Sequence, residues 1–107
     1  MAVKRIWHGW TTVENADTYQ ALLHHEIFPG IEAKQIPGYQ SIELMRQDGP
    51  EEIEFMTIMT FASLQNVIDF QGEDYARAYV PESAQRVLKR WDSHAAHYEI
   101  IEFRNYK

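Results

Sequence analysis

The order of hydrophobic and polar positions changes several times along the chain, and each change predicts an element of secondary structure. Residues Val3–Thr12 are rich in β-branched and aromatic side chains, which is typical of a strand. Residues Tyr39–Gln47 and Glu52–Phe61 have the same character, and a strong turn sequence at residues 48–51 joins them into a hairpin. Residues His94–Arg104 predict a last strand.

Apolar residues at spacings of three and four predict helices between these strands. The first helix begins after Asn15, a favourable N-cap, and Pro29 interrupts or kinks it. Its apolar stripe is Ala16, Tyr19, Leu23 and Ile27. A second helix begins after Ser63 and ends at Gly72, and Pro81 opens a third. The stripe of this third helix is Ala84, Val87, Leu88 and Trp91.

The resulting order is strand, helix, strand, strand, helical region, strand. This is the ferredoxin-like β-α-β-β-α-β plan of an α+β fold. Right-handed connections place the helices on one face of a four-stranded antiparallel sheet. The 107 residues are enough for a single domain, which we expect to span residues 1–107.

A sheet with helices on one face should alternate apolar and polar residues, but these strands are apolar on both faces. In the third strand Phe55 and Met59 point to one side, while Met56 and Ile58 point to the other. The chain has no residues left to cover the second face. We therefore expect that the same face of another copy covers it, giving a homodimer with two-fold symmetry.

Charge and composition exclude several classes of function. The net charge is −6, and the basic residues form no stripe that could follow a nucleic-acid backbone. The absence of cysteine excludes disulfides and thiolate catalysis. No apolar run approaches the ~20 residues of a membrane span, and the N-terminus lacks a signal-peptide core. We expect a cytoplasmic protein.

Several short motifs resemble one family in their order and spacing. They are Ile6-Trp7-His8-Gly9-Trp10-Thr11, Pro37-Gly38-Tyr39, Glu54-Phe55 to Phe61 with Ser63-Leu64, Gly72-Glu73-Asp74 before Val80-Pro81, and His97-Tyr98-Glu99-Ile100. From about Val3 to Phe103 the chain resembles the antibiotic biosynthesis monooxygenase domain family of the dimeric α+β barrel superfamily. The resemblance implies a dimer of facing sheets, with a ligand cavity between helices and sheet in each subunit.

The resemblance also implies a choice of activities. Some members oxidise phenols or quinols with O₂ and no cofactor, and others bind and degrade heme. The heme-degrading branch uses an Asn, Trp and His set, with its His in the second helical region. This sequence has Asn66 but no His between Ser63 and Trp91, and Phe70 stands where an indole is expected. Heme degradation is therefore disfavoured.

Oxygenation without a cofactor requires a base that deprotonates the substrate and a dry pocket that holds the anion. His97, with Glu99 on the same strand face, is the first candidate base, against the alternative of a buried structural histidine. Glu26 lies on the stripe of the first helix and is a second candidate acid or base, or an ion-pair partner. His24 and His25 lie off that stripe and read as solvated.

Aromatic residues at strand and helix spacing are more often core than ligand contacts, but some should line a cavity. The predicted substrate-binding residues are Trp7, Trp10, Phe55, Phe70, Asp74, Tyr75 and Trp91. A metal site is not expected, because no HxH or HExxH spacing occurs and His94 and His97 point to opposite faces of a strand.

The sequence favours two functions and keeps heme binding open as a less favoured third. The first is a cofactor-independent monooxygenase that acts on a small phenolic, quinol-like or polyketide-type aromatic substrate. The second is a dimeric module that binds a small ligand, or serves a stress response, without catalysis.

Overall fold

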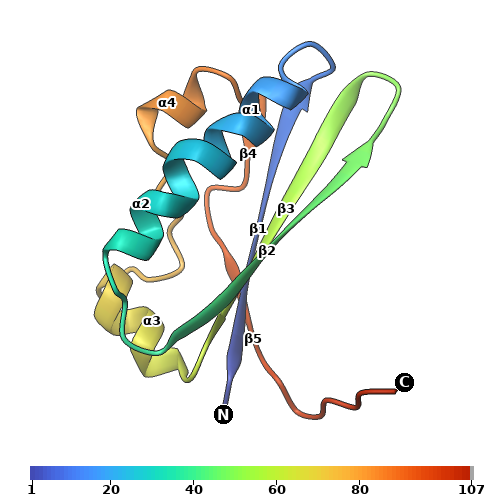
Figure 1. Ribbon diagram of the computed structural model, residues 1–107. Coiled ribbons are helices and arrows are strands. Elements are labelled where there is room, and N and C mark those ends of the chain that lie inside the picture. The colour runs from blue at the N-terminus through green and yellow to red at the C-terminus, as the bar shows by residue number, and fades with distance from the viewer. Residues whose placement is uncertain (107) are drawn as a thin grey trace.

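The computed structural model describes residues 1–106 and has the expected α+β architecture, with one layer of helices on one face of an antiparallel sheet (Figure 1). The elements are β1 (Val3–Thr12), α1 (Ala16–Leu22), the π-helix η1 (Leu23–Ile27), α2 (Phe28–Ala33), β2 (Tyr39–Asp48), β3 (Glu52–Phe61), α3 (Leu64–Gln71), α4 (Glu82–Gln85), β4 (Arg90–Trp91) and β5 (Ala96–Glu99). The strands lie in the order β2-β3-β1-β4, and β5 also pairs with β1. The predicted last strand thus corresponds to β5 alone, and β4 is an additional short strand along the same edge of β1.

The two long central strands, β1 and β3, pair without interruption from Val3 opposite Phe61 to Thr12 opposite Glu52. Because side chains alternate along a strand, the odd-numbered residues of both strands face the helices. Phe55 and Phe61 are fully buried on that face. The even-numbered residues, among them Ile6 and Ile58, form an outer face that no helix covers in Figure 1. The predicted bounds of both strands are confirmed.

The first helical segment continues past Pro29, so the expected interruption does not occur. Its backbone widens instead into the π-helix η1 immediately before α2, where proline occupies the first turn. Proline lacks an N–H, and in a regular α-helix its ring would clash with the carbonyl four residues earlier. A π-turn at this point changes the hydrogen-bonding pattern and allows the helix to pass the proline.

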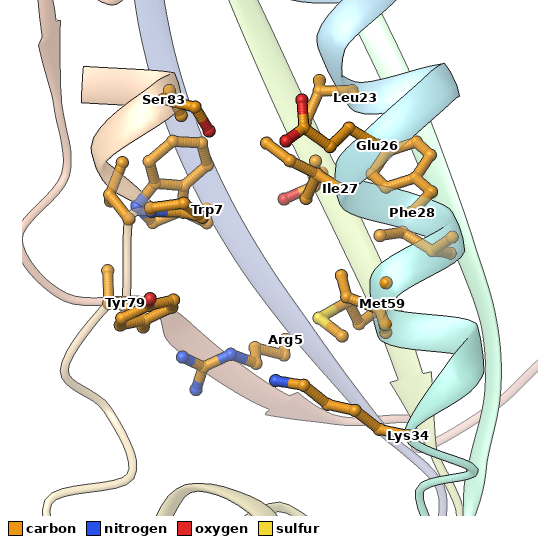
Figure 2. A pocket seen from close by; sticks show the side chains of 18 of the residues that line it. Arg5, Trp7, Leu23, Glu26, Ile27, Phe28, Lys34, Met59, Tyr79 and Ser83 are labelled. Carbon is orange, nitrogen blue, oxygen red and sulfur yellow. The ribbon is translucent and has the colours of Figure 1, made fainter. Parts of the chain in front are cut away.

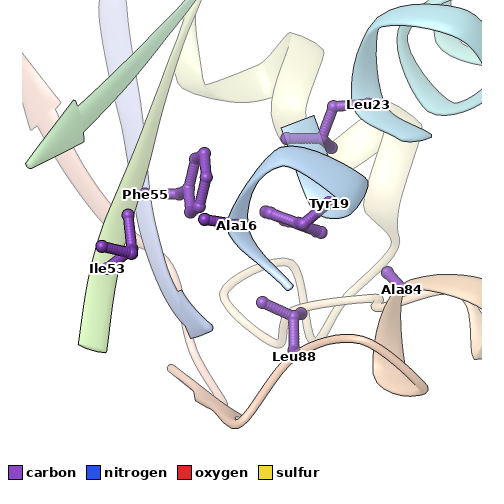
Figure 3. Packing of buried hydrophobic residues seen from close by; sticks show 7 residues of the cluster. All are labelled: Ala16, Tyr19, Leu23, Ile53, Phe55, Ala84 and Leu88. Atoms are coloured by element: carbon purple, nitrogen blue, oxygen red, sulfur yellow. The ribbon is translucent and has the colours of Figure 1, made fainter. Parts of the chain in front are cut away.

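The core lies between α1 and the sheet and consists of Ala16, Tyr19, Leu23, Ile53, Phe55, Ala84 and Leu88 (Figure 3). The rings of Tyr19 and Phe55 meet edge to face, with centroids 5.0 Å apart. Gly9 allows Trp7 and Leu88 to approach the sheet, since a Cβ there would lie 2.8 Å from the Trp7 ring and 3.0 Å from Leu88.

The last third of the chain differs most from the expectation. The predicted long helix after Pro81 is wrong, because α4 ends at Gln85 and Trp91 lies on strand β4 opposite Gly9. The predicted last strand is also shorter than expected. Its ladder ends with Glu99 opposite Val3, and one further backbone hydrogen bond joins the N–H of Ile100 to the carbonyl oxygen of Ala2 at 2.9 Å.

Residues 100–106 continue without strand structure and leave the body of the molecule (Figure 1). Ile101 and Phe103 in this segment are 79% and 80% exposed. Within residues 1–106, no helix is both long and apolar enough to cross a membrane.

Candidate functional site

A cavity of about 340 Å³ lies between the sheet and the helical layer (Figure 2). This volume is in the range of small-molecule binding sites. Its lining is mainly apolar and comprises Arg5, Trp7, Tyr19, Leu23, Glu26, Ile27, Phe28, Gly30, Ile31, Lys34, Ile42, Thr57, Met59, Phe70, Gln71, Ala78, Tyr79, Val80, Pro81, Ser83 and Ala84. The cavity is thus built from the helix-facing side of the sheet, the helical segment around η1, the end of α3, and the chain that leads into α4 together with α4 itself.

Arg5 is the charged residue of the central strand that faces this cavity, and only 6% of it is exposed. Its Nη1 donates to the carbonyl oxygen of Tyr75 at 2.6 Å, and its Nη2 donates to that of Arg77 at 3.4 Å. Nη1 also lies 2.8 Å from Nε2 of His97. These contacts hold the guanidinium against the chain segment that follows α3.

His97 lies beside Arg5 on the helix-facing side of the sheet, because it pairs with Arg5 across β1 and β5. The sequence left this choice of face undecided. Burial, together with the charge of Arg5, lowers the pKa of His97. The Tyr75 ring packs edge-on against the imidazole at a centroid distance of 5.2 Å. His97 itself is not among the residues that line the cavity.

The charges of the cavity are separated along its length. Figure 2 shows Arg5 and Lys34 toward one end, and Glu26 and Ser83 toward the other. Glu26 belongs to η1, and its carboxylate points into the cavity (Figure 2). The middle is apolar, so a ligand that spans the cavity meets cations at one end and a carboxylate and a hydroxyl at the other.

The predicted site residues are divided among several places. Glu26, Trp7 and Phe70 line the cavity. Phe55 lies below it in the core, and Trp91 packs against that core. Tyr75 contacts His97, and Asp74 is exposed, with its Oδ2 3.9 Å from Nη1 of Arg77. Trp10 lies on the outer face of the sheet, where Cζ of Arg90 is 3.8 Å from the centroid of its ring.

Sequence reasoning missed Arg5 and Lys34, although one signal pointed to the first. Val3, Arg5 and Trp7 share one face of a strand, and Arg5 is the charged residue on that face. A charged residue in such a position is uncommon and marks a paired charge or a functional site. Lys34 gave no comparable signal, because it lies after the helix end and is exposed.

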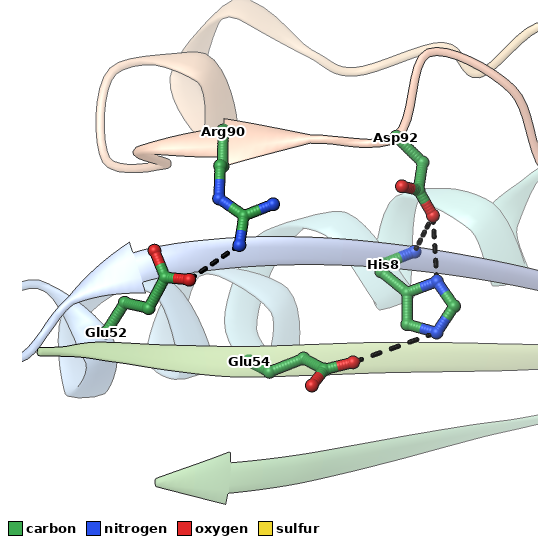
Figure 4. A network of polar contacts seen from close by, with 5 residues as sticks. All are labelled: His8, Glu52, Glu54, Arg90 and Asp92. Atoms are coloured by element: carbon green, nitrogen blue, oxygen red, sulfur yellow. Dashed lines mark hydrogen bonds and ion pairs between the residues drawn. The ribbon is translucent and has the colours of Figure 1, made fainter. Parts of the chain in front are cut away.

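The outer face carries a second group of polar residues, drawn in Figure 4. His8 Nδ1 and Asp92 Oδ2 are 2.8 Å apart, and His8 Nε2 lies 3.8 Å from Glu54 Oε2. Arg90 donates to Glu52 at 2.6 Å. These contacts tie β4 to β1 and β3. Among residues 1–106, no three His, Asp or Glu side chains gather in a geometry that could hold a metal ion.

The fold is shared with a protein of known structure. The chain superimposes on the crystal structure of a Bacillus cereus protein described as a "putative antibiotic biosynthesis monooxygenase", with a TM-score of 0.66. The match covers 100% of this chain and 98% of the other, at 6% sequence identity. No family model matches the sequence. No curated protein matches it either. The resemblance found in the sequence is therefore confirmed at the level of the fold.

Proposed function

We propose that this protein is a cofactor-independent monooxygenase that oxidises a small phenolic or quinol-like aromatic molecule with O₂. The observation that carries the proposal is the cavity between helices and sheet, whose apolar lining has cations at one end and Glu26 at the other. Such a lining can hold an aromatic anion against apolar side chains and place a base beside its acidic proton. The fold it shares with a "putative antibiotic biosynthesis monooxygenase" is consistent with this proposal.

The chemistry needs no electron donor other than the substrate. Glu26 removes the proton of a phenolic hydroxyl, and the resulting phenolate transfers an electron to O₂. The two radicals combine at a ring carbon to form a peroxide. Loss of water from this peroxide gives a quinone. One oxygen atom enters the product and the other leaves as water, so the phenol supplies all four electrons.

We propose further that a second copy of the chain covers the outer face of the sheet. Ile6, Met56 and Ile58 lie on that face, and none of the described helices covers it. Tyr98 pairs with Lys4 of the same face and is 59% exposed, and Ile101, three residues later, is 79% exposed. At ~25 cal/mol per Å², covering a few hundred Å² of apolar surface favours association by several kcal/mol.

Oxygen uptake measured with an electrode tests the oxidation. The purified protein is mixed with a panel of hydroquinones, naphthols and anthrones, and each rate is compared with that of spontaneous oxidation. The proposal predicts that at least one naphthol or anthrone consumes one O₂ per quinone formed, without added metal or flavin and without release of hydrogen peroxide. Rates equal to spontaneous oxidation over the whole panel, for a protein that binds the same compounds, would contradict it.

The second candidate function is ligand binding without oxidation, and one contact favours it. Nε2 of His97 is occupied by Arg5, so this imidazole is not free to remove a proton from a ligand in the cavity. If Glu26 does not serve as the base, the cavity binds and does not react. The binding-only function predicts tight binding of aromatic compounds together with oxygen uptake at the spontaneous rate.

A further inference from the structure

Arg5 carries a charge that the described part of the chain does not neutralise. Only 6% of Arg5 is exposed, yet no Asp or Glu of residues 1–106 forms a salt bridge with it. Its hydrogen-bond partners are two backbone carbonyls and an imidazole. Buried arginine is normally paired with an anion. The missing partner is therefore the feature to explain.

Part of the Arg5 guanidinium has no hydrogen-bond partner within residues 1–106, and Arg5 lines the cavity. Nη1 has two partners, and Nη2 has one weak partner at 3.4 Å. Nε makes none of the hydrogen bonds found within residues 1–106. The edge formed by Nε and Nη2 presents two parallel N–H groups, which is the geometry that matches a carboxylate in a bidentate pair.

The surroundings of this edge also favour an anion. Arg5 and Lys34 both line the cavity, and Figure 2 shows them toward the same end. The acidic residue of the lining, Glu26, lies toward the other end (Figure 2). An apolar stretch that includes Trp7, Ile27 and Met59 lies between the two ends. A fitting ligand therefore carries a negative group at one end of an apolar body.

We propose that the cavity binds an aromatic carboxylic acid, with its carboxylate paired to the edge of Arg5 formed by Nε and Nη2 and its ring in the apolar stretch. The proposal rests on the ligand-binding part of the proposed function and not on the oxidation. Tyr75, Arg77 and His97 hold the guanidinium in place through uncharged acceptors, which orient it without cancelling its charge. The carboxylate of the ligand thus neutralises the charge of Arg5, which no Asp or Glu of residues 1–106 does.

Binding of three matched probes, 1-naphthoate, 1-naphthamide and 1-naphthol, tests this inference by isothermal titration calorimetry at pH 7.5. The three share one ring system and differ in the head group. We expect 1-naphthoate to bind about ten- to a hundredfold more tightly than the amide or the naphthol, the loss expected for a charge-assisted pair. Equal affinity for the acid and the amide would overturn the inference, and tighter binding of the naphthol would assign Arg5 to a phenolate.

Variants of the charged residues test whether the preference for the acid depends on the cavity cations. Arg5→Gln should abolish the preference for the acid, whereas Arg86→Gln, which removes an exposed arginine outside the cavity, should keep it. Lys34→Gln, an exposed position, should reduce the preference severalfold even if Arg5→Gln fails to fold. Retention of the full preference in both cavity variants would overturn the inference. Failure of oxidation leaves these affinities unchanged, so the two proposals can fail separately.

Discussion

Nη1 of Arg5 and Nε2 of His97 lie 2.8 Å apart across the paired strands β1 and β5. A guanidinium can only donate hydrogen bonds, so Nε2 must accept, and the imidazole is neutral with its proton on Nδ1. Burial first, and then the charge of Arg5, lowers the pKa of His97 below its ordinary value of 6.5. Protonation of His97 at Nε2 therefore breaks its hydrogen bond with Arg5.

This dependence on protonation predicts a loss of stability in mild acid. Because the pKa of His97 is lower in the folded state, the unfolded chain binds the proton first as the pH falls. The contribution of neutral His97 is complete above pH 6.5 and is lost as the pH falls from there through the folded pKa. Urea unfolding between pH 8 and 5 measures it. In His97→Gln, whose amide oxygen can still accept from Arg5, this part of the pH dependence should disappear; an unchanged profile would show that His97 does not titrate in this way.

Two glycines give a matched test of the packing under the helical layer. A Cβ on Gly9 would lie within 3.0 Å of Trp7 and Leu88, and overpacking of this kind costs typically about 1–3 kcal/mol. Gly30 lies in helix α2 with nothing within 4 Å, so alanine there should stabilise by roughly 0.5–1 kcal/mol. Thermal unfolding of Gly9→Ala and Gly30→Ala should give shifts of opposite sign, and equal shifts would contradict the packing described.

Phe55 belongs to the core and Phe70 to the cavity lining, so alanine at the two positions should have different effects. Phe55 is fully buried against Tyr19, and Phe55→Ala should lower the free energy of unfolding by about 3–5 kcal/mol. Phe70 is partly exposed and lines the cavity, so Phe70→Ala should cost less stability but weaken the binding of an aromatic probe. Chemical denaturation and calorimetry measure the two effects. A larger stability loss at Phe70 than at Phe55 would reverse this assignment.

Glu26 is the acidic group of the cavity lining and the proposed base. Removing a general base typically lowers turnover by about 10²–10⁴-fold, so Glu26→Gln should lose most of the oxygen uptake while binding persists. Glu32→Gln, an exposed acidic residue of α2 outside the lining, is the control. Uptake that survives in Glu26→Gln at the wild-type rate would exclude this residue as the base.

The first two-thirds of the fold could be predicted from the sequence because the pattern there is local. Strands Val3–Thr12 and Glu52–Phe61 are long and continuous, and Ser63 accepts from the Asn66 N–H as a cap should. The last third could not be predicted. Ala84, Leu88 and Trp91 do pack in or against one core, as a helical stripe would, but Trp91 does so from a strand. These residues are apolar because they are packed in or against the core. Trp91 has strand conformation because it pairs with Gly9 at the edge of β1.

The candidate site could be predicted only in part, because a cavity is formed by residues far apart in the sequence. Trp7, Glu26 and Phe70 follow from their residue types and spacing. The placement of His97 behind Arg5, and not in the cavity, depends on the register of β5 against β1. A shift of one residue would reverse the face of every side chain in that strand, and nothing in the local sequence sets this register.

We propose that one face of the sheet lines the ligand cavity and the other forms the interface between two copies of the chain. Met59 and Met56 of β3 lie on these two faces and probe them separately. Met59 lines the cavity, whereas Met56 points to the outer face. Methionine methyl groups labelled with ¹³C can be followed by NMR during titration with 1-naphthoate and, separately, during dilution of the protein. We predict that the probe shifts Met59 and leaves Met56 in place, and that dilution shifts Met56 and leaves Met59 in place. A probe that shifts Met56 alone would contradict the claim.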